Sequence, residues 1–131
     1  MTLRFVTRRV HAWIDYPVAL SLVTVPFLLN VGSGNPLARW VSVTTGVAAL
    51  VLTLLTDHET GLFKVLPYRF HIAVDRLVGV TFVAVPFVLG LSGLDAGYYW
   101  ANAAAVLAAT VLFAAPEPFV QPSTKPVAAT C

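Results

Sequence analysis

Hydrophobic residues fill four long stretches of the chain that no charged residue interrupts. These uncharged runs span about 23, 17, 18 and 21 residues, each near the length that crosses the hydrocarbon core of a bilayer as a helix. They lie between Asp15 and Arg39, Arg39 and Asp57, Arg76 and Asp95, and Asp95 and Glu117. None carries the polar stripe that a helix of a soluble bundle needs. The pattern therefore predicts an all-α integral membrane protein with four spans.

Turn-forming residues separate these runs. Gly-Ser-Gly-Asn-Pro fills positions 32–36, and Ser-Gly-Leu-Asp-Ala-Gly fills positions 92–97. The connection between the two halves of the chain carries Lys64 and Arg69. We therefore predict membrane spans from about His11 to Val31, Leu37 to Thr56, Phe70 to Leu91 and Tyr98 to Ala115.

The composition agrees with this prediction. Of the 131 residues, 58% are hydrophobic and 11% are charged, and the mean hydropathy is +0.82; about a quarter of the residues in ordinary globular proteins are charged. The net charge of +2 does not indicate nucleic-acid binding, because the basic residues cluster at the predicted membrane edges. Cys131 is the only cysteine, so an internal disulfide is excluded.

Basic residues are shared unequally between the two predicted sides of the membrane. The side that would hold both termini and the middle connection has seven of the eight, and the other side has only Arg39. Because basic residues favour the cytoplasmic side, we expect both termini in the cytoplasm. All three histidines and five of the six acidic residues lie on that same side, which places any chemistry there.

The second half of the chain repeats the first. A shift of 60 positions aligns polar and aromatic residues without a gap, and such matches carry weight because an apolar alphabet repeats itself by chance. The aligned pairs include Arg9 and Arg69, His11 and His71, Asp15 and Asp75, Pro26 and Pro86, and Trp40 and Trp100. The expected division is a basic cytoplasmic lead-in (1–10), a first two-span repeat (11–60), a cytoplasmic loop (61–69), a second two-span repeat (70–117) and a disordered tail (118–131).

Each repeat contributes two spans, so both enter the membrane in the same direction. We expect a four-helix bundle of two tandem helical hairpins, related by a pseudo-two-fold axis along the membrane normal. A spacing of four places each His-Asp pair on one face of its helix. The same face reaches Leu22 and Pro26 in the first span and Phe82 and Pro86 in the third.

The repeat resembles that of the bacterial SPW-repeat membrane proteins, in which a Ser-Pro-Trp closes the first span and a Trp-x-Asn begins the second. This chain keeps the proline and replaces its two neighbours. The matching positions are Val25-Pro26-Phe27 and Val85-Pro86-Phe87, then Trp40-Val41-Ser42 and Trp100-Ala101-Asn102. The resemblance implies a two-span repeat and a location in the bacterial inner membrane, and it implies no biochemical activity.

Six titratable side chains lie near the predicted cytoplasmic ends of the four spans. They are His11, Asp15, His71, Asp75, Asp57 and Glu117. In an up-down bundle they share one level, and two imidazoles with four carboxylates could hold zinc, manganese or non-haem iron. These six residues are the candidate metal ligands.

Two other interpretations remain open, and a third is disfavoured. Each His-Asp pair could belong to a structural network at the helix ends, completed by nearby arginines such as Arg8, Arg9, Arg69 and Arg76. A b-type haem could bind between His11 and His71. A proton or ion path is disfavoured, because beyond the two aspartates the spans offer only Ser21, Thr24, Thr81 and Asn30.

The sequence contains no nucleophile with a base in reach, no Gly-rich phosphate loop and no paired cysteines. It therefore favours a non-enzymatic membrane protein, a structural or partner-binding element with a His/Asp/Arg network at its cytoplasmic end. The alternative is a metal- or b-haem-binding membrane protein that uses His11, His71, Asp15 and Asp75. The lipid bilayer is the expected surrounding, and both a membrane-protein partner and a homo-oligomer remain open.

Overall fold

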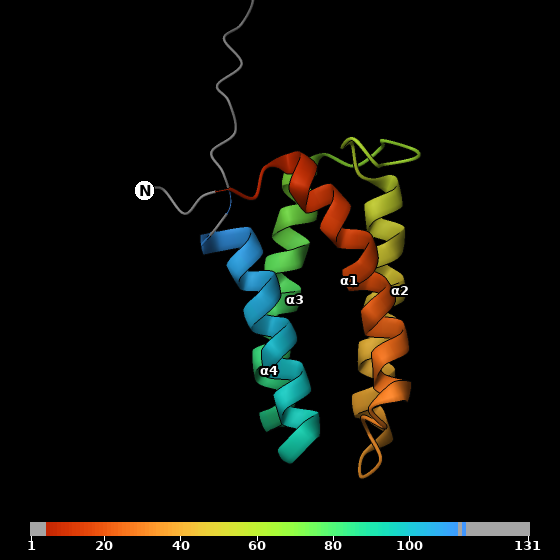
Figure 1. Ribbon diagram of the computed structural model, residues 1–131, viewed down its shortest axis with the longest axis vertical. Helices are drawn as coiled ribbons and strands as arrows, with labels where there is room; N and C mark the ends of the chain where they lie inside the picture. Colours follow the sequence, from red (N-terminus) through yellow and green to blue (C-terminus); the bar gives the residue numbers. More distant parts are fainter. Residues whose placement is uncertain (1–4, 113, 115–131) are drawn as a thin grey trace, which may run out of the picture.

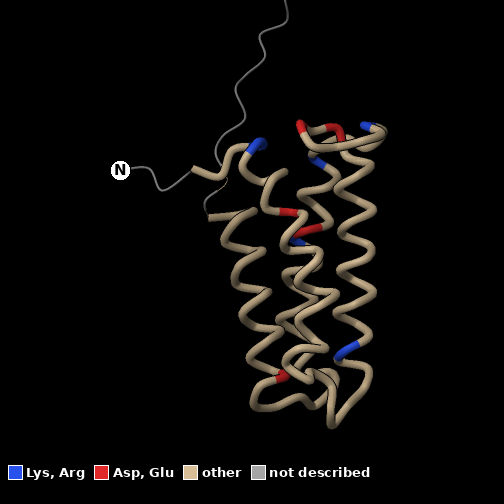
Figure 2. Tube along the Cα trace, turned by 45° about the vertical axis from the view of Figure 1, so that its right-hand side comes forward, with Lys and Arg blue, Asp and Glu red and all other residues tan. Residues whose placement is uncertain are grey.

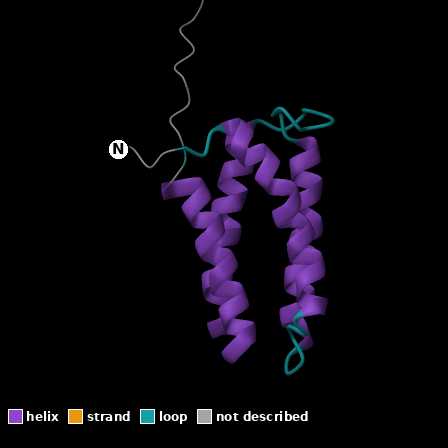
Figure 3. Cartoon of the chain, in the orientation of Figure 1, coloured by secondary structure: helices purple, strands orange, loops and turns teal. Residues whose placement is uncertain are grey.

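The described part of the chain is all-helical, as predicted. The computed structural model describes residues 5–112 and 114. Its α-helices are α1 (Arg8–Leu28), α2 (Pro36–Leu55), α3 (Tyr68–Val88) and α4 (Gly93–Leu107), followed by a π-helical segment, Ala108–Leu112 (Figure 1). No β-strand occurs among the described residues (Figure 3). The predicted tail (118–131), with Cys131, and the candidate ligand Glu117 lie outside them.

Three helices, α1, α2 and α3, are long and apolar enough to cross a membrane. The α-helical part of α4 has 15 residues and spans about 22 Å at 1.5 Å per residue, less than the roughly 30 Å of a bilayer core. The π-helical segment then extends it by five residues. Among the described helices, α1, α2 and α3 therefore meet the length and hydropathy that the predicted membrane spans require.

The outward surface of the helices is strongly apolar. Leu28, Val88 and Phe87 are 80%, 78% and 73% exposed, and many other large hydrophobic side chains face outward as well. Soluble monomers rarely expose contiguous apolar patches of this extent. The surface is suited to contact with lipid.

Local capping interactions fix where the helices begin. The Thr7 side chain accepts a hydrogen bond of 3.3 Å from the Val10 N–H, so α1 starts at Arg8, three residues before the predicted span. The Asn35 side chain likewise accepts from the Leu37 N–H at 3.1 Å and caps α2. The predicted boundaries were set by hydrophobicity, which does not detect a polar cap that extends a helix.

The helices pack as two hairpins, α1 with α2 and α3 with α4 (Figure 1). In the first hairpin the backbones approach closely at Gly46, where a Cβ atom would lie 2.8 Å from the Ala19 carbonyl oxygen. The Ser42 hydroxyl donates to the Leu22 carbonyl at 2.8 Å in the same hairpin. In the second hairpin, Gly79 meets the Leu107 side chain.

The hairpins also contact each other in the half of the molecule that contains the short turns 29–35 and 89–92, which we call the turn end. Within the second hairpin, the Phe82 ring packs on the Tyr99 ring, with 4.8 Å between centroids. The Tyr99 hydroxyl donates to the Ala38 carbonyl of the other hairpin. The Asp95 carboxylate accepts from the Gly32 N–H at 3.1 and 3.2 Å. The residues predicted to share a helix face with the His-Asp pairs, Leu22, Pro26, Phe82 and Pro86, are all buried.

Charged residues gather at the two ends of the helices and are sparse in the middle (Figure 2). We call the end formed by the start of α1, the 56–67 connection and the start of α3 the basic end. There, Arg8 pairs with Asp57 at 3.9 Å and Arg9 with Glu59 at 2.9 Å. At the turn end, the Arg39 guanidinium donates to the Val31 carbonyl at 2.9 Å.

Candidate metal centre

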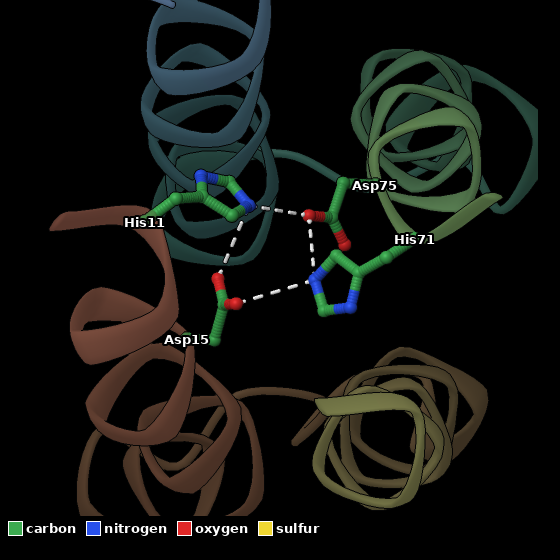
Figure 4. Close-up of side chains that lie close together, drawn as sticks. All are labelled: His11, Asp15, His71 and Asp75. Carbon is green, nitrogen blue, oxygen red and sulfur yellow. Dashed lines mark hydrogen bonds and ion pairs between the residues drawn. The ribbon is translucent and has the colours of Figure 1, made fainter. Parts of the chain in front are cut away.

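Four side chains from α1 and α3 converge near the basic end (Figure 4). His11 and Asp15 lie one turn apart on α1, and His71 and Asp75 lie one turn apart on α3. One potential ligand atom from each residue lies within 4.8 Å of the other three. We call these four residues the His/Asp centre. The two pairs that the spacing of four placed on single helix faces thus point at each other.

Each imidazole Nε2 faces both carboxylates. His11 Nε2 lies 2.9 Å from Asp75 Oδ2 and 3.3 Å from Asp15 Oδ1. His71 Nε2 lies 3.2 Å from Asp15 Oδ2 and 3.2 Å from Asp75 Oδ2. The contacts form a closed ring in which imidazoles and carboxylates alternate (Figure 4).

The centre is withdrawn from water. The exposed fraction of the side chain is 5% for His11, 2% for His71, 11% for Asp15 and 17% for Asp75. Removing a carboxylate from water costs several kcal/mol unless a positive charge and hydrogen bonds compensate nearby. Two carboxylates in one buried centre therefore require positive charge between them, as protons on the imidazoles or as a bound cation.

Hydrogen bonding within the ring is incomplete. His11 Nε2 and Asp75 Oδ2 form a hydrogen bond. By contrast, Asp15 Oδ2 is buried without a hydrogen-bond partner although it lies close to His71 Nε2, and His11 Nδ1 is also without one. An unsatisfied buried polar atom costs about 1–3 kcal/mol. The ring is therefore poorly explained as a hydrogen-bonded network alone.

Thr56, at the end of α2, fixes the protonation of one imidazole. Its hydroxyl donates to the Leu52 carbonyl at 2.7 Å, which uses its single proton. The same oxygen lies 2.9 Å from His71 Nδ1, so it accepts a hydrogen bond from the N–H of that nitrogen. In a neutral His71 ring the Nε2 atom then carries a lone pair directed at the two carboxylates. This arrangement is repulsive unless a proton or a metal ion lies there, and a polar partner on the far nitrogen is typical of metal-binding histidines.

A third buried histidine, His58, lies beside the centre in the 56–67 connection. It is 3% exposed, and its ring centroid is 5.7 Å from that of His71. Burial lowers the pKa of His58 below its ordinary value of 6.5 and thus favours the neutral ring. Its Nε2 atom has no hydrogen-bond partner. Sequence reasoning did not include His58 among the candidate ligands, because it has no counterpart in the second half; the only signal was its position directly after a predicted span.

Asp57, a fifth candidate ligand, lies apart from the centre. Its side chain is 61% exposed and pairs with Arg8, which supplies the positive charge expected beside an acid at a helix C-terminus. The arginines near the centre are also engaged elsewhere. Arg9 binds Glu59, and Arg76 donates to the Thr110 carbonyl at 2.7 Å. Among the described residues, the basic partners within ion-pair distance of Asp15 and Asp75 are therefore the two histidines and not an arginine.

Imidazole nitrogen and carboxylate oxygen are the donors that zinc, manganese and ferrous iron accept in proteins. Calcium and magnesium are bound almost entirely by oxygen. The donor set of the His/Asp centre thus suits a transition metal. Its two carboxylates match the charge of a divalent ion.

Comparisons with described protein families, with curated proteins and with solved structures found no match to this chain. The resemblance to the SPW-repeat proteins therefore stays a prediction. The function has to be inferred from the geometry of the chain itself.

Proposed function

We propose that this protein is a four-span integral membrane protein that binds one divalent transition-metal ion at the His/Asp centre. The observation that carries the proposal is the convergence of four largely buried ligand atoms, from two helices, within 4.8 Å of one another. Each of the two helices contributes one His-Asp pair with the same spacing. Asp15 Oδ2, which has no hydrogen-bond partner, and His71 Nε2 both lie inside this group.

The separations between the ligand atoms favour a small tetrahedral ion. Bonds of about 2.0 Å to zinc place the corners of a tetrahedron about 3.3 Å apart. Four imidazole–carboxylate separations, 2.9–3.3 Å, are already near this value, and the ligand atoms as a group, which lie within 4.8 Å of one another, would draw closer around an ion. Zinc is therefore the first candidate, with manganese and ferrous iron as the others.

Four spans require that α4 and its π-helical extension cross the membrane together. Their combined length, Gly93–Leu107 followed by Ala108–Leu112, equals that of α2. The excess of basic residues at the basic end supports a cytoplasmic location for that end, with both termini on the same side. We place the protein in the bacterial inner membrane on this argument and on the resemblance to the SPW-repeat proteins.

An internal duplication is also part of the proposal. Support comes from matched backbone bonds at the ends of α1 and α3. The Val31 N–H binds the Pro26 carbonyl and the Leu91 N–H binds the Pro86 carbonyl, both at 2.8 Å. The duplicated hairpins would form a four-helix bundle around a pseudo-two-fold axis, which would bring the two His-Asp pairs to equal depth.

A second candidate function is a structural or partner-binding element without metal. The hydrogen bond between His11 Nε2 and Asp75 Oδ2 favours it, since two protonated imidazoles could neutralise the two carboxylates. Such a network would hold the hairpins together at the basic end. In this case the protein has no catalytic role and acts through contacts of its surface.

A b-type haem fits the centre less well. A porphyrin between two axial histidines must separate their rings, with the macrocycle filling the space around both nitrogens. Here the carboxylates occupy that space, at 2.9–3.3 Å from each Nε2 atom, and the two imidazole centroids are 5.7 Å apart. The geometry therefore favours a bare ion over a haem.

Elemental analysis of the detergent-purified protein tests the proposal. We expect about one equivalent of zinc, manganese or iron in the wild type and little in a His11→Ala/His71→Ala double variant, because each site of this kind holds one ion. Asp57→Asn is the matched control, since it removes an exposed carboxylate at the same end. Equal, near-zero metal in all three proteins, after purification without chelators and after incubation with each metal, would favour the structural network instead.

A further inference from the structure

One buried histidine nitrogen beside the His/Asp centre is not part of the proposed metal site. His58 is 3% exposed, and its Nε2 atom has no hydrogen-bond partner. Its ring packs edge-on against His71, with 5.7 Å between centroids. A buried polar atom of this kind is rarely left unpaired in a native structure.

The protonation of His58 follows from its neighbours, as it does for His71. The Thr60 hydroxyl donates to the Ala12 carbonyl at 3.2 Å, which uses its only proton. The same oxygen lies 3.3 Å from His58 Nδ1, so that nitrogen must be the donor. The Nε2 atom of the neutral ring therefore carries a free lone pair. It is ready to bind a metal ion without losing a proton.

The backbone around His58 is held in place. The Tyr16 hydroxyl donates to the Thr60 carbonyl at 2.7 Å and ties the connection to α1. The turn that follows is tight, because a Cβ atom on Gly61 would lie 1.8 Å from the Thr56 carbonyl oxygen. The buried imidazole thus has a fixed position beside the centre, while its neighbours in sequence, Asp57 and Glu59, are exposed.

We propose that His58 is a transfer ligand, which binds an incoming divalent transition-metal ion and passes it to the His/Asp centre. This inference rests on the proposed function. Two observations support transfer over permanent binding. His58 lies in the surface connection of the basic end, between exposed residues and the buried His71. It is also not among the residues whose ligand atoms lie within 4.8 Å of one another.

The transfer is an exchange of ligands with no redox step. His58 Nε2 replaces one water ligand of the hydrated ion at the edge of the centre. His71 Nε2 and the carboxylates of Asp15 and Asp75 then replace His58 and the remaining water, and His11 completes the site. The protons that the metal-free centre holds on His11 and His71 are released to water as the ion enters. The two carboxylates then balance the double charge of the ion, and His58 returns to its neutral, unbound form.

Rates of metal exchange test this role. Purified metal-free protein in detergent is mixed with Zn²⁺ or Co²⁺ to follow uptake, and the loaded protein is mixed with excess chelator to follow release. For His58→Ala we expect both rates to fall about tenfold, with the equilibrium affinity within about twofold of the wild type, since a group that acts only on the path lowers the barrier in both directions by the same amount. His58→Gln keeps an amide that can donate to Thr60, so it repeats the test if the alanine variant fails to fold.

Glu59→Gln is the matched control, because it alters the adjacent exposed side chain and should leave both rates unchanged. Unchanged rates in both His58 variants, with metal still bound, would overturn the transfer role and leave the proposed function intact. A weaker affinity with unchanged uptake would also overturn it, since His58 would then be a permanent ligand. A wild type that binds neither metal would overturn the proposed function itself, and the transfer role with it.

Discussion

The two ends of the helices differ in how completely their buried polar groups are hydrogen-bonded. At the turn end, the Tyr99 hydroxyl donates to the Ala38 carbonyl, and the Tyr98 hydroxyl lies 2.6 Å from Ser42 Oγ, which in turn donates to a carbonyl. Asp95 accepts from a backbone N–H. At the basic end, His11 Nδ1, Asp15 Oδ2 and His58 Nε2 have no hydrogen-bond partner, although Asp15 Oδ2 lies 3.2 Å from His71 Nε2.

Among the described residues, every buried side-chain atom without a hydrogen-bond partner belongs to the basic end. A network that only holds helices together gains most when all its groups are paired. A ligand site, by contrast, must leave lone pairs directed at the space that the ion will fill. The contrast between the ends therefore supports the proposed binding role for the unpaired Asp15 Oδ2 and His58 Nε2 atoms of the basic end, whereas His11 Nδ1 lies on the side of its ring away from the carboxylates.

The same chemical change should weaken metal binding at the basic end and leave it unchanged at the turn end. Asp75 contacts both imidazoles of the centre, so Asp75→Asn removes a ligand and half of the compensating charge. We expect the affinity for zinc to fall about 100-fold or more, beyond the 10- to 100-fold typical of residues that merely orient a ligand. Competition with a chromophoric chelator measures the change.

Asp95→Asn is the control at the turn end. It keeps an oxygen that can accept from the Gly32 N–H, and it lies at the opposite end of the helices from the centre. The zinc affinity should equal that of the wild type. A similar loss of affinity in both variants would mean that the asparagine substitutions act through the fold and would remove the distinction between the ends.

Thr56→Val tests the orientation of His71. The substitution keeps the shape of a fully buried side chain and removes the oxygen that accepts from His71 Nδ1. We expect the metal affinity to fall 10- to 100-fold, because the far nitrogen of a ligating histidine loses the partner that fixes its tautomer. An unchanged affinity, measured by the same chelator competition, would contradict the assigned tautomer.

Tyr98→Phe should change stability and leave metal binding alone. The variant loses the hydroxyl that contacts Ser42, and the free energy of unfolding should fall by about 1 kcal/mol, the usual net value of one hydrogen bond. Unfolding in denaturing detergent measures this loss. A change in metal affinity in this variant would show that the two ends are coupled.

Much of the fold could be predicted from hydrophobic runs and charges. The all-helical structure and the spans of α1, α2 and α3 follow from the length of the uncharged runs. The start of α1 at Arg8 could not be predicted in this way, because the hydrogen bond from Val10 to Thr7 extends the helix into polar sequence. The short α4 was not foreseen either, since hydrophobicity does not distinguish α-helical from π-helical backbone.

The candidate site, like the fold, could be predicted from the sequence only in part. The spacing of four in both halves was enough to predict that His11 and Asp15, and His71 and Asp75, share helix faces. The meeting of the two pairs depends on how the hairpins pack, which the sequence pattern does not fix. The role of Thr56 depends on which group its hydroxyl donates to, and such proton counts become available only with coordinates.

The smallest predicted effect concerns pH and His58 in the metal-free protein. Burial lowers the pKa of His58 below 6.5, and positive charge at His71 and Arg8 acts in the same direction, against Asp15. As the pH falls below about 6.5, the unfolded chain takes up a proton at this position and the native protein does not, so stability falls. With chelator present, the melting temperature of the wild type should therefore drop more between pH 7.5 and 5.5 than that of His58→Gln. The difference between the two drops should be smaller than the change in melting temperature that Tyr98→Phe causes. Equal drops would indicate that His58 reaches water in the native state, and the buried lone pair assigned to the basic end would then be paired with solvent.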